Sequence, residues 1–237
     1  MSEHDAVTQI RIAVARRDHV DLVRLLTLGP WPPYTLHLIG GGLVDAVTAG
    51  ADGAQAAATK CVAVLRERGW DGDDELAIAL EAAYGAVPHP DLRPLPVDLE
   101  ELSSSLEGDP LNGGGQIDLM TGAVWPNQVL DDMPELRDDE DSERWLWFDS
   151  MGSRAGYHDM VDFLGLVDDE RLAGRLSRAL EGRGAFRRFK GALSDRPELL
   201  QLYFLFSDER KAGRARAFLA DQGYTPVSFS SEESDEQ

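Results

Sequence analysis

The chain has 237 residues, of which 43% are hydrophobic, and a formal net charge of −20. That length is sufficient for one large domain or two small ones, and the hydrophobic share is sufficient for a packed core. The negative charge argues against general affinity for a nucleic-acid backbone or an anionic lipid surface, because both require a positive face on the protein. A local basic patch is still compatible with this charge balance.

The composition also indicates a cellular compartment. The single cysteine, Cys61, cannot form a disulfide within the chain, which favours a reducing environment. The first ten residues lack the basic-then-apolar pattern of a signal peptide, and no apolar run approaches the roughly 18 residues that cross a bilayer. We therefore expect a cytoplasmic protein with no membrane partner.

Residues 1–90 are predicted to form a helical domain, because apolar residues recur there at three- and four-residue spacing. Residues 22–29 match residues 62–69 at an offset of 40. Each unit would be a helix, a turn marked by glycine and a second helix, which is the plan of helical-hairpin repeats. The alternative is coincidence, since glycine commonly follows the end of any helix.

Residues 91–96 are predicted to be a linker, because prolines crowd this part of the chain and disfavour helix at each preceding residue. A helix follows, with Asp98 as its N-cap and Glu101 three residues later, as in a capping box. Three glycines at residues 113–115 then break the chain. They lack the lysine and the serine or threonine that complete a phosphate-binding loop.

A β-hairpin is expected next, where Ile117 and Leu119 alternate with a polar residue and a Thr-Gly pair precedes Val124. Residues 131–143 contain eight acidic residues and one arginine, which predicts a solvated loop. Residues 145–148 should return as a strand beside the hairpin. Because all four are bulky, we expect this strand to be covered on both faces or at its ends.

Three helices are expected after this strand. Ser153 is a candidate N-cap for the first of them, and Asp168 or Asp169 for the second. The third helix spans residues 185–193, after a Gly-Arg-Gly break. Its buried face is predicted from the three- and four-residue spacing of its apolar side chains, which are Phe186, Phe189 and Leu193.

The C-terminal part is predicted to hold one more strand and one more helix. Residues 199–206 are rich in apolar and aromatic side chains and predict the strand, and residues 208–222 predict the helix. The acidic, serine-rich residues 226–237 are expected to be a disordered tail. The fold class is therefore α+β, with a helical N-terminal domain followed at residues 97–225 by a small antiparallel sheet packed by helices.

Several segments of the second domain carry a family resemblance. In order they read WFDS, SRAGYHDMVDF, GRGAFRRFKGAL and LYFLFSDERKAGRARAFLADQG. This order resembles a bacterial family known as uncharacterised protein family 0158, over about residues 97–225. The resemblance implies an α+β domain in a cytoplasmic bacterial protein, and it implies no activity. Residues 1–90 lie outside it.

One basic segment is the best candidate for a binding site. Seven basic residues and one acidic residue lie between residues 171 and 191, a local charge of 7 − 1 = +6. The Gly182-Arg183-Gly184 turn should present free backbone N–H groups at a helix start, where phosphates and carboxylates bind. Arginine forks add bidentate hydrogen bonds. The residues proposed to bind an anion or a partner are Arg154, Arg183, Arg187, Arg188 and Lys190.

The alternative without a binding function is that these cations pair with the acidic residues 131–143 or lie solvated on helix surfaces. No catalytic residue is proposed, because Ser153 and His158 have no orienting acid and fit a helix cap and an exposed face. Asp149 and Arg154 fit a structural polar pair. The histidines are scattered and the cysteine is alone, so no metal and no cofactor are expected.

The leading hypothesis is a non-enzymatic binding or regulatory module for a protein partner or an anionic ligand. The first alternative is nucleic-acid or nucleotide binding, with Phe186 or Phe189 stacking on bases if either ring is exposed, and the net charge disfavours it. The second is an enzyme of unknown chemistry. A pocket lined jointly by Asp149, Arg154, Tyr157 and Arg183 would favour that reading. The sequence does not specify an oligomeric state.

Overall fold

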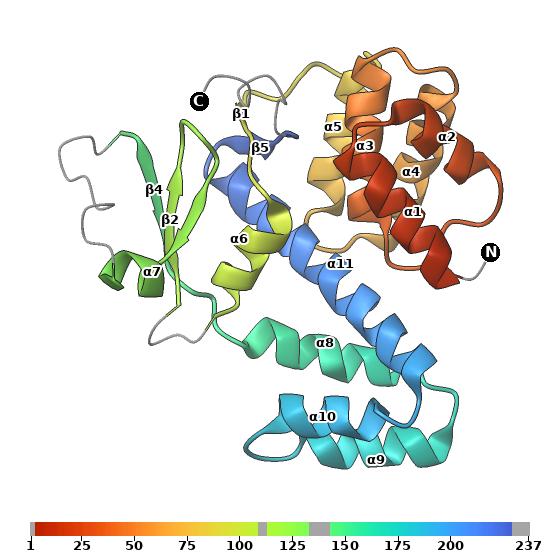
Figure 1. The fold of residues 1–237 in the computed structure, drawn as a ribbon, viewed down its shortest axis with the longest axis vertical. Coiled ribbons are helices and arrows are strands. Elements are labelled where there is room, and N and C mark those ends of the chain that lie inside the picture. The colour runs from red at the N-terminus through yellow and green to blue at the C-terminus, as the bar shows by residue number, and fades with distance from the viewer. Residues whose placement is uncertain (1–2, 109–112, 133–142, 229–237) are drawn as a thin grey trace.

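A bundle of five helices forms the N-terminal part of the protein (Figure 1), as a computed structural model that describes residues 3–108, 113–132 and 143–228 places it. The inward faces of these helices share one apolar core, in which Ile39, Leu65 and Leu80 are fully buried. The helical character expected for this region is confirmed. The helices are α1 (Glu3–Ala15), α2 (His19–Thr27), α3 (Leu36–Thr48), α4 (Ala54–Arg68) and α5 (Asp73–Ala83).

The two predicted helical hairpins correspond to α2–α3 and α4–α5. Their internal turns differ in conformation. Gly69 follows α4 with a left-handed φ of +63°, whereas α2 is followed by Leu28 in a right-handed helical conformation. Glycine supplies the left-handed turn only in the second pair. An internal repeat therefore stays a prediction.

The proline-rich segment at residues 91–96 is built into the fold. It contains β1 (Arg93–Leu95), which pairs in parallel with the last strand, β5 (Tyr224–Pro226). Leu95 is fully buried in a cluster that also holds Leu102 of α6 (Leu99–Leu106). The segment is thus no free tether, and the boundary between residues 1–90 and 97–225 stays a prediction.

A three-stranded antiparallel sheet has the order β3-β2-β4, with β2 (Gly115–Asp118), β3 (Val124–Pro126) and β4 (Trp145–Phe148). The first two strands are the predicted hairpin, and β4 pairs with β2 as expected. Phe148 is buried, but Trp147 is 53% exposed. The strand is therefore covered at its end and not on both faces.

Two predicted irregular segments lie partly outside the described residues. The acidic stretch 131–143 begins inside α7 (Asn127–Asp132), and residues 133–142 are not described. The predicted tail 226–237 begins with Pro226 in β5, and the Ser228 hydroxyl donates a hydrogen bond to Asp45 at 2.5 Å. Residues 229–237 are outside the described range.

Three helices pack on one another at one end of the molecule (Figure 1), namely α8 (Arg154–Leu164), α9 (Glu170–Leu180) and α10 (Ala185–Leu193). Asp169 is the N-cap of α9 and accepts hydrogen bonds from the backbone N–H groups of Arg171 and Leu172. Phe189 and Leu193 are fully buried, as predicted, together with Phe163 of α8. Phe186 is only half-buried.

The prediction of a strand at residues 199–206 is wrong, because these residues belong to the long helix α11 (Pro197–Asp221). Pro197 suits the first turn of a helix, where its missing N–H has no helical partner to lose. The buried side chains in this stretch, Tyr203 and Phe206, are three residues apart, which is helical spacing. A continuous apolar run conceals that spacing in the sequence.

Helix α11 runs along the molecule and joins its parts (Figure 1). It packs against α3 and α5 of the N-terminal bundle, against α6 and β5 beside the small sheets, and against α8 and α10. The architecture is α+β. Within the described ranges, no helix combines the length and apolar character that crossing a membrane would require.

Candidate anion-binding groove

An open groove of about 710 Å³ lies where the start of α8 meets the turn between α9 and α10. The first residues of α8 and of α10 both line it, so two helix N-termini open onto one space. Such ends carry backbone N–H groups without helical partners and a partial positive charge. The groove is lined by Met151, Gly152, Ser153, Arg154, Tyr157, His158, Gly182, Gly184, Ala185 and Phe186.

Neither of these two helix N-termini is capped by a side-chain hydrogen bond. Ser153 occupies the N-cap position of α8, as predicted, but its side chain accepts no hydrogen bond from the first turn. Gly184 is the N-cap of α10 and has no side chain to offer. By contrast, Asp98 and Asp169 both cap their helices through a carboxylate. The groove therefore lies beside two first turns without side-chain caps.

Glycines shape both walls of the groove. Gly182 and Gly184 have left-handed φ values of +72° and +76°, which glycine adopts without strain, and they turn the chain from α9 into α10. A Cβ on Gly156 in α8 would lie 3.3 Å from the Phe186 ring. The absence of a side chain at Gly156 lets α8 and α10 approach each other. Gly156 and the Gly182–Gly184 turn therefore shape the same contact between these two helices.

Arg188 is the clearest structural member of the predicted site. Its Nε donates to the Ala179 carbonyl at 3.2 Å, and its Nη groups donate to the carbonyls of Glu181, Gly182 and Arg183. Those are the last carbonyls of α9 and of its following turn, which lack helical donors. Arg188 therefore closes the α9–α10 turn, and four of its five N–H donors are already engaged.

The other predicted cations lie apart from one another. Arg154 lines the groove and is exposed, while Arg183 and Arg187 are exposed nearby on the α9–α10 turn and α10. The Lys190 ammonium lies 5.6 Å from the centre of the Phe204 ring on α11. The structure thus places Arg154 and the backbone of the Gly-Arg-Gly turn together, and it does not place all five cations on one wall.

The aromatic residues divide between core and groove. Phe189 is fully buried against Tyr203 and Phe163, so its ring is closed to any stacking ligand. Phe186 is half-buried and lines the groove. The groove also includes Tyr157 but neither Asp149 nor Arg183, so the four-residue pocket that would have favoured an enzyme is not assembled there.

A buried ionic network joins α8 to α11, and its residues were not among the predicted site residues. The Asp159 carboxylate is fully buried and accepts hydrogen bonds from Arg214 at 2.8 and 3.1 Å and from Arg210 at 3.1 Å. Arg214 also bonds to Glu107 at 2.9 Å, and Arg210 reaches Asp162 at 3.2 Å. The spacing Asp159–Asp162 on one helix and Arg210–Arg214 on another was a readable signal of facing charged stripes.

A second buried network ties the N-terminal helices to α11. Asp73 is fully buried and bonds to Arg68 at 2.5 and 2.9 Å and to His37 at 3.2 Å. Arg68 also reaches Glu209 of α11 at 2.7 Å. Burial alone would raise the pKa of Asp73, but hydrogen bonds from Arg68, His37 and the Trp70 backbone outweigh it and lower the pKa to about 2.

Comparison with known proteins gives one informative match. The chain is 30% identical over 142 residues to a UPF0158 protein of Pseudomonas aeruginosa, in an alignment that covers 57% of this chain and 89% of the relative. Nearly the whole relative is therefore represented here, beside additional residues. No family model matches the chain, and no solved structure matches it.

Proposed function

The chain belongs to the UPF0158 family, whose name specifies no activity, and we propose that it is a non-enzymatic binding or regulatory module. Its ligand is an anion or an acidic protein partner held in the groove between α8 and the α9–α10 turn. One observation carries this proposal: two helix N-termini without side-chain caps line the same groove as the exposed Arg154. A phosphate or carboxylate there would meet backbone donors and a guanidinium fork.

The expected affinity follows from exposure. Charges at exposed helix ends contribute about 0.3–1 kcal/mol each, and salt screens them over about 8–10 Å. A single anionic group would therefore bind weakly. A ligand with several acidic groups, such as a polyphosphate or an acidic peptide segment, would engage the groove and the neighbouring Arg183 and Arg187 together.

The proposed location is the cytoplasm. Cys61 is buried and free, and burial raises the pKa of its thiol to about 12. A thiol held protonated in an apolar core is inert toward exchange. The support for this location is that a single cysteine cannot form a disulfide within the chain, as is usual in a reducing compartment.

The groove is tested by titrating the full chain with a fluorescent polyphosphate at about 50 mM salt, a Debye length of roughly 14 Å. Arg154→Glu should weaken binding at least tenfold, because it replaces the cation in the groove with a repelling anion. Arg171→Glu, an exposed arginine near the start of α9, is the matched control for net charge. Equal binding by the two variants, or no binding by the natural chain, would contradict the proposal.

Nucleotide binding is a second candidate, because the half-buried Phe186 ring lines the same groove. A nucleotide could place its phosphates at the helix ends and its base on that ring. Phe186→Leu keeps an apolar side chain but removes the aromatic face. Loss of nucleotide binding with unchanged polyphosphate binding would favour this candidate over a partner read by charge alone.

A further inference from the structure

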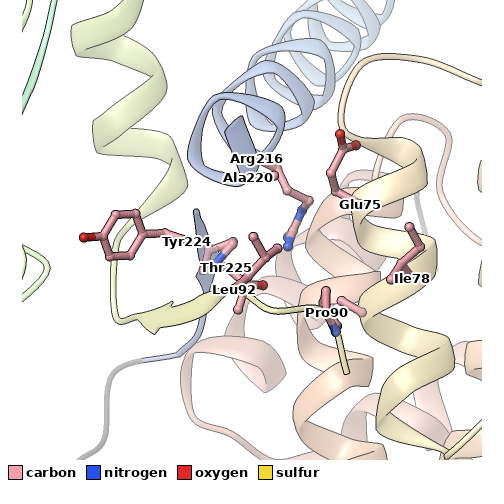
Figure 2. A pocket seen from close by; sticks show the side chains of 10 residues that line it. Glu75, Ile78, Pro90, Leu92, Arg216, Ala220, Tyr224 and Thr225 are labelled. Carbon is pink, nitrogen blue, oxygen red and sulfur yellow. The ribbon is translucent and has the colours of Figure 1, made fainter. Parts of the chain in front are cut away.

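A small, partly open cavity of about 60 Å³ lies between α5, α11 and the β1–β5 pair (Figure 2). It shares no lining residue with the groove. Its walls are mostly apolar and come from three separate stretches of the chain. They are formed by Glu75, Ile78, Ala79, Pro90, Leu92, Arg216, Ala220, Tyr224, Thr225 and Pro226.

Arg216 is the unusual residue among those that line this cavity, because it is a buried cation. Its side chain comes from α11 and is only 5% exposed, yet its buried Nε has no hydrogen-bond partner among the described residues. No carboxylate within the described part of the chain forms an ion pair with it either. The neighbouring network offers none, because Glu209 is already bonded to Arg68 and to the His37 backbone.

Glu75 does not form an ion pair with the Arg216 guanidinium in the described structure. It lies on the same cavity and is only half-buried, and Figure 2 shows its carboxylate directed away from the Arg216 guanidinium. Burial lowers the pKa of Arg216 to about 10, which Glu209 and Glu75 partly oppose from a distance. The group is still protonated at neutral pH. A buried cation without a paired anion is costly, so this arrangement calls for an anionic ligand.

We propose that this cavity binds a short-chain monocarboxylate, with the carboxylate on Arg216 and the alkyl chain against the apolar walls. Nε is fully buried and closed to a ligand atom. The carboxylate would therefore bond to the two Nη groups, whose side-by-side donors on the planar guanidinium match its two oxygens. Ile78, Leu92 and Ala220 supply apolar surface for two or three carbons. The nearby negative charge of Glu75 disfavours a dianion such as phosphate.

The volume agrees with a ligand of this size. A cavity needs roughly 10–15 Å³ of volume available to the centre of a water molecule to hold one water. The space beside Arg216 therefore holds several small atoms, and a sugar, a nucleotide or a peptide segment would extend beyond it. Acetate and propionate are the probes that fit.

The test is a titration of the full chain with sodium propionate, with sodium chloride holding ionic strength constant, followed by methyl NMR of Ile78 and Leu92. We expect shifts of both methyl groups that saturate, and a rise in melting temperature of about 2–4 °C at ten times the dissociation constant. Arg216→Met should abolish both effects. Arg187→Ala, an exposed arginine of α10, should leave both unchanged and separates this cavity from the groove.

A second variant guards against misfolding of Arg216→Met. Ala220→Leu fills the cavity while the cation stays in place, and it should weaken propionate binding at least tenfold. Methyl shifts that persist in Arg216→Met, or no saturable shift in the natural chain up to 100 mM propionate, would overturn the proposal. The latter result would leave Arg216 hydrated by water alone. Neither result bears on polyphosphate binding in the groove.

Discussion

Glu209, in the middle of α11, accepts a bifurcated hydrogen bond from the backbone N–H of His37, with each carboxylate oxygen 3.1 Å from the nitrogen. His37 lies in the first turn of α3, where the N-cap residue Thr35 makes no side-chain cap hydrogen bond. A carboxylate 172 residues away in sequence therefore caps the positive end of α3. The contact fixes the N-terminal bundle to the longest helix.

Removing this remote cap should destabilise the whole fold. Glu209→Ala would leave the His37 N–H without its acceptor, while Arg68 would keep its bonds to Asp73. Leaving a buried donor unsatisfied typically costs about 1–3 kcal/mol. Chemical denaturation of the two proteins measures this difference. Glu81→Ala is the control, because its partner Arg66 is 53% exposed and such a pair contributes less than about 1 kcal/mol. Equal losses would contradict a special role for Glu209.

Stability should fall at acidic pH through Asp73. Its folded-state pKa is about 2 and its ordinary value is 3.8, so its contribution is fully present above about pH 4. The contribution is lost as the pH falls from about 4 to 2, because the unfolded chain takes up the proton first. The loss is about 2 kcal/mol, since one pKa unit corresponds to about 1.4 kcal/mol. The free energy of unfolding measured at each pH gives this slope.

The control for that slope is a pair of variants on α5. Asp73→Asn should be less stable at neutral pH and should lack this part of the acid-induced loss. Asp74→Asn changes an exposed carboxylate in the same first turn and should keep it. Parallel pH profiles for all three proteins would show that Asp73 is not the titrating group.

A close backbone contact between α11 and the turn that precedes α5 gives the third prediction. A Cβ on Gly213 of α11 would lie 2.1 Å from the Asp71 carbonyl oxygen and 2.9 Å from His37 Nε2. Gly213→Ala should therefore force the helices apart and cost at least about 1–3 kcal/mol. Gly191→Ala in α10 meets no atom within 4 Å and should stabilise the protein by about 0.5–1 kcal/mol. Melting temperatures that move in the same direction would contradict this account.

The elements that sequence predicted well are those set by local chemistry. Asp98 and Asp169 begin helices because a carboxylate there bonds to nearby N–H groups, and both do so. The hairpin follows from alternation around Gly122, whose φ is +76°. In each case the residues that decide the structure are neighbours in the chain.

What sequence could not predict depends on distant partners. Glu209 and Arg216 lie seven residues apart on α11. Nothing local shows that Glu209 is paired while the buried Arg216 Nε has no partner among the residues that the structure describes. Arg188 resembled its exposed neighbour Arg187, and only the path of the α9–α10 turn shows that it bonds to carbonyls. The candidate groove needed the same information, because its two helix ends meet only in the folded chain.

The last prediction separates the structural arginine from its neighbour. Arg188→Ala removes the donor to four carbonyls of the α9–α10 turn, and it should destabilise the protein by about 1–3 kcal/mol and loosen the turn. Amide hydrogen exchange at residues 180–186 should accelerate at least tenfold, since the turn would open locally. Arg187→Ala, on the exposed side of the same helix, should change neither quantity, while it weakens polyphosphate binding modestly. If Arg188→Ala leaves exchange and stability unaltered but abolishes polyphosphate binding, then Arg188 belongs to the ligand site, and its contacts with the turn are not what holds α10 in place.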